Sequence, residues 1–150
     1  MLTVGVDTVS VCLSKGLGAP VGSVLAGSHE RVAHARRVRK MLGGGVRQGG
    51  VLAAAGLLAL DRLPELAVDH ENARLLADGL RELGWLVDEP QTNIVLADAP
   101  DPAAAVAHLA ELGVRALPVA GRVRFITHRD VDADDIRAAL GRMTSLTCHS

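Results

Sequence analysis

The sequence predicts an α/β fold in two parts, from two observations. Short apolar runs, which are typical of buried strands, alternate with longer segments whose apolar residues recur at helical spacing. Near Leu63-Pro64 the composition changes from a very apolar, Ala-rich segment to an amphipathic one. We therefore expect a domain boundary there, with domains at 1–62 and 63–150. The alternation of helices and strands in the second domain is typical of an open α/β sandwich.

The first domain is expected to contain two strands followed by two helices. Residues 7–13 and 21–26, rich in Val and Leu, are typical of buried strands on either side of a turn. Ser28 can cap the helix that follows, and the three glycines at 43–45 would end it. The Ala-rich segment 48–60 predicts a helix whose apolar surface is buried against another element.

The second domain is expected to alternate helices with strands. Its first helix carries apolar residues at i+3, i+4 and i+7 spacings and ends at Gly84. Asp101-Pro102 opens another helix, with a capping residue followed by proline. The expected helices are 65–83, 101–113 and 132–146, and the expected strands are 85–87, 93–97, 114–119 and 123–127.

Composition and charge argue against several classes of function. Hydrophobic residues make up 49% of the chain but aromatic residues only 1%, which argues against a base-stacking nucleic-acid surface. The net charge of −1 favours neither DNA nor an anionic membrane, and no apolar run approaches the roughly 20 residues of a membrane span. The start of the chain lacks the pattern of a secretory signal, so we expect a cytoplasmic protein. Cysteines and histidines show no metal-ligand spacing, and we expect no metal.

The most informative stretch is SKGLGAPVGS, residues 14–23. It places Lys15 at the end of an apolar run and before a turn rich in glycine. In a tight, partly dry pocket the pKa of a lysine falls, because burial disfavours the charged form, and the amine becomes a nucleophile toward aldehydes. A Schiff-base lysine for pyridoxal phosphate (PLP) requires this chemistry. A bare Ser-Lys-Gly sequence is more often an exposed turn, so the residues alone leave both interpretations open.

Arg124 and Arg47 are candidate anion-binding residues. Side chains alternate along a strand, so Val123 and Phe125 belong against the core while Arg124 turns toward a cleft between the domains. The planar guanidinium group of Arg124 could bind a carboxylate there. Arg122, on the same face of the strand, is a weaker candidate for this role. Arg47 follows three glycines and precedes a helix, whose unpaired N–H groups favour an anion. The alternative for Arg124 is an ordinary surface arginine in a strand. The alternative for the segment that carries Arg47 is an ordinary flexible connector.

Four stretches closely resemble the low-specificity L-threonine aldolases, fold-type-I PLP enzymes of the β-eliminating lyase and aldolase group. They are VCLSKGLGAPVGS at 11–23, KMLGGGVRQ at 40–48, TNIV at 92–95 and VRFITHRDV at 123–131. They occur in the expected order and extend the resemblance over nearly the whole chain. The implied fold is the C-terminal part of an aspartate aminotransferase-like enzyme. It would comprise a remnant of the large PLP-binding domain at 1–62 and a small α/β sandwich domain at 63–150.

The resemblance also implies a cofactor, an activity and site residues. The cofactor is PLP, and the complete enzyme would cleave L-threonine or L-allo-threonine to glycine and acetaldehyde. Lys15 would be the catalytic lysine that binds PLP, Arg47 would reach the phosphate across a subunit interface, and Lys40 would lie near the same site. Arg124 would bind the carboxylate of the amino-acid substrate. The implied assembly is a homo-oligomer.

In this family the lysine lies past the middle of a chain about twice this length, which implies that the present chain is a C-terminal half. The family's upstream phosphate cradle, ring-stacking histidine and aspartate would then lie outside it. We therefore expect the chain alone to associate, to bind PLP weakly and to be inactive unless a partner polypeptide completes it. The alternatives are another fold-type-I PLP lyase or hydroxymethyl transferase, and a non-catalytic fragment or partner subunit.

Overall fold

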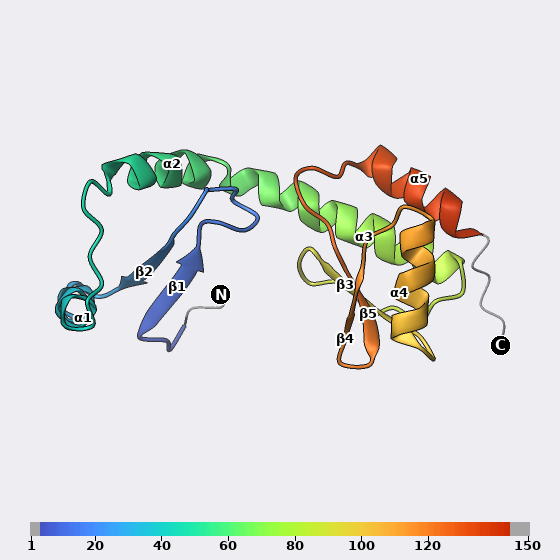
Figure 1. Cartoon of the computed structure of the whole chain (residues 1–150), viewed down its shortest axis with the longest axis horizontal. Coiled ribbons are helices and arrows are strands. Elements are labelled where there is room, and N and C mark those ends of the chain that lie inside the picture. The colour runs from blue at the N-terminus through green and yellow to red at the C-terminus, as the bar shows by residue number, and fades with distance from the viewer. Residues whose placement is uncertain (1–3, 145–150) are drawn as a thin grey trace. The chain divides into compact units, whose positions relative to one another are not determined.

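The computed structural model describes residues 4–144, and Figure 1 labels its helices and strands. Contacts within the chain divide it into two compact units, Met1–Pro64 and Glu65–Ser150, which we call the N-terminal unit and the C-terminal unit. A short 3₁₀ helix, Leu63–Glu65, lies at the division. In the described part of the chain, none of the helices is long and apolar enough to cross a membrane.

The N-terminal unit contains the two strands and two helices that the sequence predicts. Strands β1 (Thr8–Cys12) and β2 (Ser23–Gly27) pair antiparallel. Helix α1 (His29–Met41) begins after Ser28, whose hydroxyl accepts a backbone N–H of the first turn at 3.3 Å. Helix α2 (Gly50–Asp61) follows the glycine loop. Local patterns and caps were sufficient to find these elements, because both depend on neighbours in sequence.

These elements are less buried than their patterns predict, because the described residues of this chain do not cover them. All five residues of β2 are exposed, and α2 buries only Gly56 and Ala59. Large apolar side chains of α2 therefore lie at the surface, with Val51 77% and Leu57 66% exposed. Periodicity identifies apolar side chains, but burial also requires a covering element, and the described residues of this chain leave these side chains uncovered.

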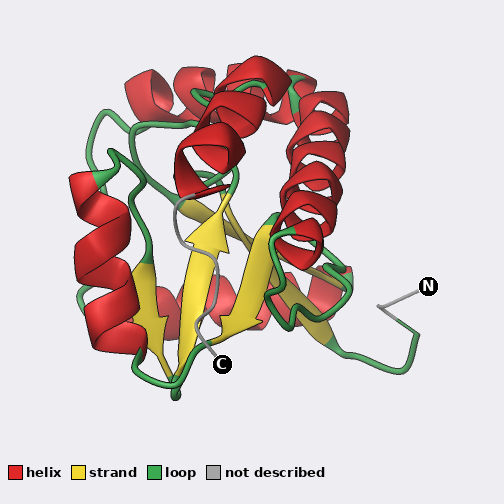
Figure 2. Ribbon diagram, turned by 90° about the vertical axis from the view of Figure 1, so that its right-hand side faces the viewer, coloured by secondary structure: helices red, strands yellow, loops and turns green. Residues whose placement is uncertain are grey.

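The C-terminal unit is a three-stranded antiparallel sheet with helices packed against it. Figure 2 draws strands in yellow and helices in red. Strand β5 is central and has β3 on one side and β4 on the other. The strands are β3 (Ile94–Asp98), β4 (Leu117–Val119) and β5 (Arg122–Ile126), and the helices are α3 (Leu66–Glu82), α4 (Pro102–Glu111) and α5 (Ala133–Met143). Side chains from all three helices join those of β3 and β5 in one core, so this unit is an α/β sandwich.

Alternation along β3 and β5 decides which strand residues reach this core. Val95 and Val123 are fully buried and Phe125 is 3% exposed. The rings of Phe125 and Trp85 meet edge to face, with centroids 6.4 Å apart. Such a pair adds about 0.5–1.5 kcal/mol to the stabilisation from buried area. Leu109 of α4, also fully buried, packs in the same cluster. The sheet therefore has one apolar face and one outer face.

Two predicted strands are shorter than expected, because backbone groups at their starts cap helices instead. The N–H of Trp85 donates to the carbonyl oxygen of Leu80 at 3.0 Å, and the N–H of Val114 donates to that of Leu109 at 2.8 Å. Hydrogen bonds of this kind end a helix and remove the donor from a strand ladder. The segment after α3 makes a single β-bridge, and the segment after α4 pairs only as β4. Residues 145–146, the end of the predicted last helix, lie outside the described residues.

Candidate active site

Lys15 lies in a turn that connects β1 to β2 and is closed by three backbone hydrogen bonds. The N–H of Leu13 donates to the carbonyl oxygen of Gly22 at 2.9 Å, and the N–H of Ala19 donates to that of Leu13 at 2.9 Å. Inside this loop, the N–H of Gly18 donates to the carbonyl oxygen of Lys15 at 2.8 Å. The backbone around Lys15 is therefore held in one conformation. Gly18 has φ of +72°, a region that glycine adopts without strain.

Helix α2 supports the base of this turn. A Cβ built at the buried Gly56 would lie 3.1 Å from Cδ1 of Leu13, so the helix approaches the end of β1 closely at this point. Leu13 itself is 7% exposed. The apolar residues of the turn thus pack inward while Lys15 remains outside.

The side chain of Lys15 is exposed, so the predicted partly dry pocket is not formed by the described residues. Its Nζ has no hydrogen bond or ion pair within the described part of the chain. Nearby, Sγ of Cys12 lies 3.4 Å from Oγ of Ser14, and this hydrogen bond holds the pKa of the Cys12 thiol below its ordinary value. The amine of Lys15 is accessible and has no competing partner among residues 4–144.

Lys40 and Arg47 lie on either side of the glycine loop between α1 and α2. Both side chains are exposed. Nζ of Lys40 lies 4.0 Å from the position that a Cβ would take at Gly45, so its amine folds back over this loop. Gln48, directly after Arg47, has φ of +52°, which turns the chain into α2. The structure therefore brings Lys40 to the loop that carries Arg47, and no described hydrogen bond or ion pair joins either to Lys15.

Arg124 lies on the outer face of the central strand β5, as alternation predicts. Its backbone is held on both sides, because its Cα is in register with Leu96 of β3 and Leu117 of β4. The side chain is half-buried, and its guanidinium has no hydrogen bond or ion pair within residues 4–144. Arg124 thus places a cation without a described partner on a strand whose backbone is paired on both sides, and this cation can bind an external anion.

Arg122 lies on the same face but is occupied, so it is not a substitute for Arg124. Its Nη1 lies 2.5 Å from a carboxylate oxygen of Asp88, and its Nε lies 2.5 Å from one of Asp98. Its Nη2 donates to the carbonyl oxygen of Leu96 at 3.2 Å. The hydrogen bond from Arg122 holds the pKa of the Asp88 carboxyl below its ordinary value, and the same bond raises the pKa of Arg122.

Polar residues inside α3 were missed by sequence reasoning. Asp69 and Asn72 are each 4% exposed. The amide of Asn72 donates to the carbonyl oxygen of Val131 at 3.1 Å, and burial raises the pKa of the Asp69 carboxyl. The sequence pattern could have indicated them, because both residues occupy the helix face that also carries Ala73 and Leu76. A polar residue is unexpected on this apolar face.

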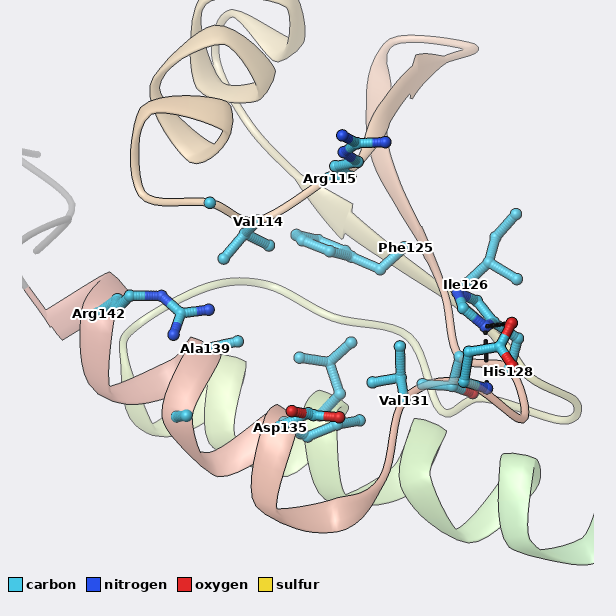
Figure 3. A pocket seen from close by; sticks show the side chains of 15 residues that line it. Val114, Arg115, Phe125, Ile126, His128, Val131, Asp135, Ala139 and Arg142 are labelled. Carbon is cyan, nitrogen blue, oxygen red and sulfur yellow. Dashed lines mark hydrogen bonds and ion pairs between the residues drawn. The ribbon is translucent and has the colours of Figure 1, made fainter.

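A groove of about 420 Å³ lies between α5 and the end of β5, and Figure 3 shows it from close by. Phe125 and Val131 provide apolar lining, while Asp135 and Arg142 of α5 point into it. Nε of Arg142 also donates to a backbone carbonyl oxygen at 2.8 Å. Phe125 lies on the core face of β5, opposite the face of Arg124. Arg124 is not among the residues that line the groove.

Comparison with known proteins places the chain in a family. The model of the family described as "Beta-eliminating lyase" matches residues 1–102, which is more than half of the chain. The chain belongs to the beta-eliminating lyase family. The resemblance that the four motifs indicate is thus confirmed at the level of the family.

This member of the beta-eliminating lyase family is similar to proteins named as threonine aldolases. Low-specificity L-threonine aldolase 1 of Arabidopsis thaliana is 43% identical over 146 residues, which cover 89% of this chain and 40% of that protein. Low specificity L-threonine aldolase of Escherichia coli (strain K12) is 41% identical over 135 residues, 87% of this chain and 40% of that protein. The chain thus spans about 40% of the length of these curated relatives.

Solved structures confirm the predicted fold class of this chain. Sphingomonas wittichii serine palmitoyltransferase superposes with a TM-score of 0.75 at 25% identity, over 93% of this chain and 39% of that one. Aspartate aminotransferase of Thermotoga maritima superposes with a TM-score of 0.70 at 17% identity, over 95% of this chain and 40% of that one. The chain therefore has the α/β fold of part of a fold-type-I, aspartate aminotransferase-like enzyme.

Proposed function

We propose that this lyase carries the lysine-bearing part of a PLP-dependent low-specificity L-threonine aldolase. The substrate would be L-threonine or L-allo-threonine, and the products glycine and acetaldehyde. The observation that carries the proposal is the fixed turn that presents Lys15, in a chain 43% identical to the Arabidopsis threonine aldolase. In this assignment residues 1–62 belong to a large PLP-binding domain and residues 63–150 form a small domain.

The residues present fit PLP by their chemistry. The aldehyde of PLP requires a primary amine, and Nζ of Lys15 is accessible and has no described partner. The phosphate requires cations, which Arg47 and Lys40 supply at one loop, close to the N-terminus of α2. We propose that Lys15 holds the cofactor and that Arg47 and Lys40 bind its phosphate, with Arg47 acting across a subunit interface of a homo-oligomer. When bound, PLP supplies an electron sink for breaking the Cα–Cβ bond of an amino acid.

Arg124 would bind and orient the substrate. Its planar guanidinium can form two parallel hydrogen bonds to an α-carboxylate. Binding the carboxylate in one orientation also sets the direction of the Cα–Cβ bond, which is the bond to be broken. Arg122 cannot compete for the carboxylate, because Asp88 and Asp98 already neutralise it.

The exposed apolar surface of the N-terminal unit favours a second, compatible role, that of a subunit completed by another polypeptide. Val51 and Leu57 of α2 are apolar and exposed, and surfaces of this kind are typical of protein interfaces. In this role the chain would supply Lys15 and Arg124 to a shared enzyme rather than act alone.

A labelling experiment tests the cofactor lysine. The sequence contains only two lysines, Lys15 and Lys40, so charge-conserving variants give a matched pair. The chain is incubated with limiting PLP, reduced with borohydride and mapped by mass spectrometry. We expect the label on Lys15 in the wild type and in Lys40→Arg, and its loss in Lys15→Arg. A label on Lys40 alone, or shared equally by both lysines, would contradict the assignment.

The activity is then measured with the chain mixed with the part of the Arabidopsis relative that this chain does not match. Acetaldehyde and glycine should form from L-threonine with the wild-type chain and not with Lys15→Arg. Release of ammonia without acetaldehyde would instead support a different PLP lyase.

A further inference from the structure

Asn93 and Thr127 join the ends of two strands through reciprocal hydrogen bonds. The side-chain amide of Asn93 donates to the carbonyl oxygen of Thr127 at 2.8 Å, and the backbone N–H of Thr127 donates to that of Asn93 at 3.0 Å. The hydroxyl of Thr127 donates to the carbonyl oxygen of Asp69, in α3, at 2.6 Å. Thr127 is only 2% exposed. One buried threonine thus links β3, β5 and α3.

This link lies beside the strand segment that carries Arg124. Asn93 directly precedes β3 and Thr127 directly follows β5, so their bonds extend the ladder beyond Ile94 and Ile126, the last partners in register. Arg124 is two residues before Ile126. The C-terminal end of β5 can therefore neither fray nor slide along β3 without breaking the bonds of Asn93 and Thr127.

Ion pairs of Arg122 stabilise the position of the other end of β5. Arg122 is paired with Asp88 and Asp98 on the outer face of the sheet. Arg124 lies between the two held ends, and its own guanidinium has no described partner that would fix it. Its position therefore depends on the backbone of β5. Misplacement of a substrate-binding group by about 1 Å can cost roughly 100-fold in rate.

We propose that Asn93 and Thr127 are positioning residues that fix Arg124 for binding the substrate carboxylate. The proposal rests on the proposed function, in which Arg124 makes that contact. A role in stability alone would lower the resistance of the C-terminal unit to unfolding and leave the affinity of the folded protein unchanged. A positioning role changes the affinity for a carboxylate while the protein stays folded.

The experiment measures binding of L-threonine to the folded chain by NMR, from backbone amide shifts of β5 and the side-chain N–H of Arg124. L-Threoninol, which lacks the carboxylate, is the control ligand. We expect Asn93→Asp and Thr127→Val to weaken L-threonine binding roughly tenfold or more. Thr127→Ser keeps the hydroxyl and should retain most of the affinity.

Asn72→Asp is the matched control variant. Its amide makes an equally buried bond to a backbone carbonyl, that of Val131, outside the β3–β5 ladder. We expect this variant to be less stable but to bind L-threonine as the wild type does. In an Arg124→Ala background, adding Asn93→Asp should cause no further loss of binding, because the residue through which it acts is gone.

The outcomes separate the two proposals. If Arg124→Ala loses binding while Asn93→Asp and Thr127→Val bind normally, the positioning role is wrong and the role of Arg124 stands. An equal loss in Asn72→Asp would also overturn the positioning role, since the effect would then be general destabilisation. If the wild type binds L-threonine no better than L-threoninol, or if Arg124→Ala binds normally, the carboxylate role is wrong and the positioning role fails with it.

Discussion

Arg122 and Arg124 lie on the same face of β5, two residues apart, yet their guanidinium groups have different surroundings. Arg122 has carboxylates of Asp88 and Asp98 within 2.5 Å, whereas Arg124 faces neither. The difference arises from the register of β5 with β3, because Arg122 lies opposite Asp98 whereas Arg124 lies opposite Leu96. At the scale of single residues, the environment and not the residue type decides which cation is available to a ligand.

Asp69 shows the same dependence on environment for a carboxylate. It is 4% exposed, and burial raises its pKa, while His128, His70 and Arg129 act in the opposite direction and Glu65 adds to the rise. Its ionised form is therefore disfavoured in the folded protein. Ionisation of Asp69 costs folding free energy.

We expect the stability of the Asp69→Asn variant, compared with that of the wild type, to increase as the pH rises. The folded pKa lies above the unfolded one, so the cost of ionisation is absent below the unfolded value of about 3.9 and complete above the folded value. The free energy of unfolding of the wild type, relative to Asp69→Asn, should thus fall as the pH rises through this window. Urea unfolding followed by Trp85, the single tryptophan, measures it.

Asp134→Asn, at an exposed carboxyl of α5, serves as the control. A pH dependence that is equal in both variants would show that the burial of Asp69 has no energetic consequence.

At the scale of elements, caps decide where helices begin. Helix α5 starts with a capping box, in which the carboxylate of Asp132 accepts the N–H groups of Asp134 and Asp135 at 2.9 Å. The carboxylate of Asp135 in turn accepts the N–H of Asp132 at 3.2 Å. Both bonds connect neighbours in sequence, which is why this helix start is predictable from local residues.

Asp132→Ala should destabilise the C-terminal unit by about 1 kcal/mol, because it leaves two N–H groups of α5 without an acceptor. Asp134→Ala removes only an exposed ion pair with Arg137 and should cost about 0.5 kcal/mol or less. Urea unfolding monitored by Trp85 fluorescence measures both. Equal losses would mean that the negative charge near the helix start, and not the cap, carries the stabilisation.

At the scale of the whole molecule, burial is distributed unequally. The main core cluster extends from Ala73 to Met143 and lies entirely in the C-terminal unit. In the N-terminal unit, α1 has no buried residue. Because buried apolar area supplies most of the free energy of folding, the two units should differ in their resistance to opening.

We expect hydrogen exchange in the intact chain to be slowest at the backbone amides of Val95 and Val123, which require unfolding of the C-terminal core. Amides of α1 should exchange roughly 100-fold faster or more, through local opening. Exchange followed by NMR in low denaturant measures both. Equal protection of α1 and β5 would show that the N-terminal unit is stabilised by contacts other than its own buried residues.

Much of the fold was predictable because it depends on local residues. The alternation that separates Phe125 from Arg124 and the cap at Ser28 involve residues close in sequence, and both are observed. The strand expected at 85–87 is reduced to a single β-bridge at Val87, because the N–H of Trp85 closes the end of α3. The pattern of apolar residues alone does not show that a backbone N–H group already donates a hydrogen bond to the preceding helix.

For the candidate site, too, some features were predictable from the sequence and others required the tertiary structure. The sequence by itself was sufficient to predict the family, through the motifs around Lys15 and Arg124, and the match of the family model over residues 1–102 confirms it. Only the tertiary structure showed that Arg122 is occupied by Asp88 and that Asn93 is bonded to Thr127, 34 residues away. Such pairings join segments distant in sequence, and a carboxylate or an amide finds its partner only when the sheet brings those segments together.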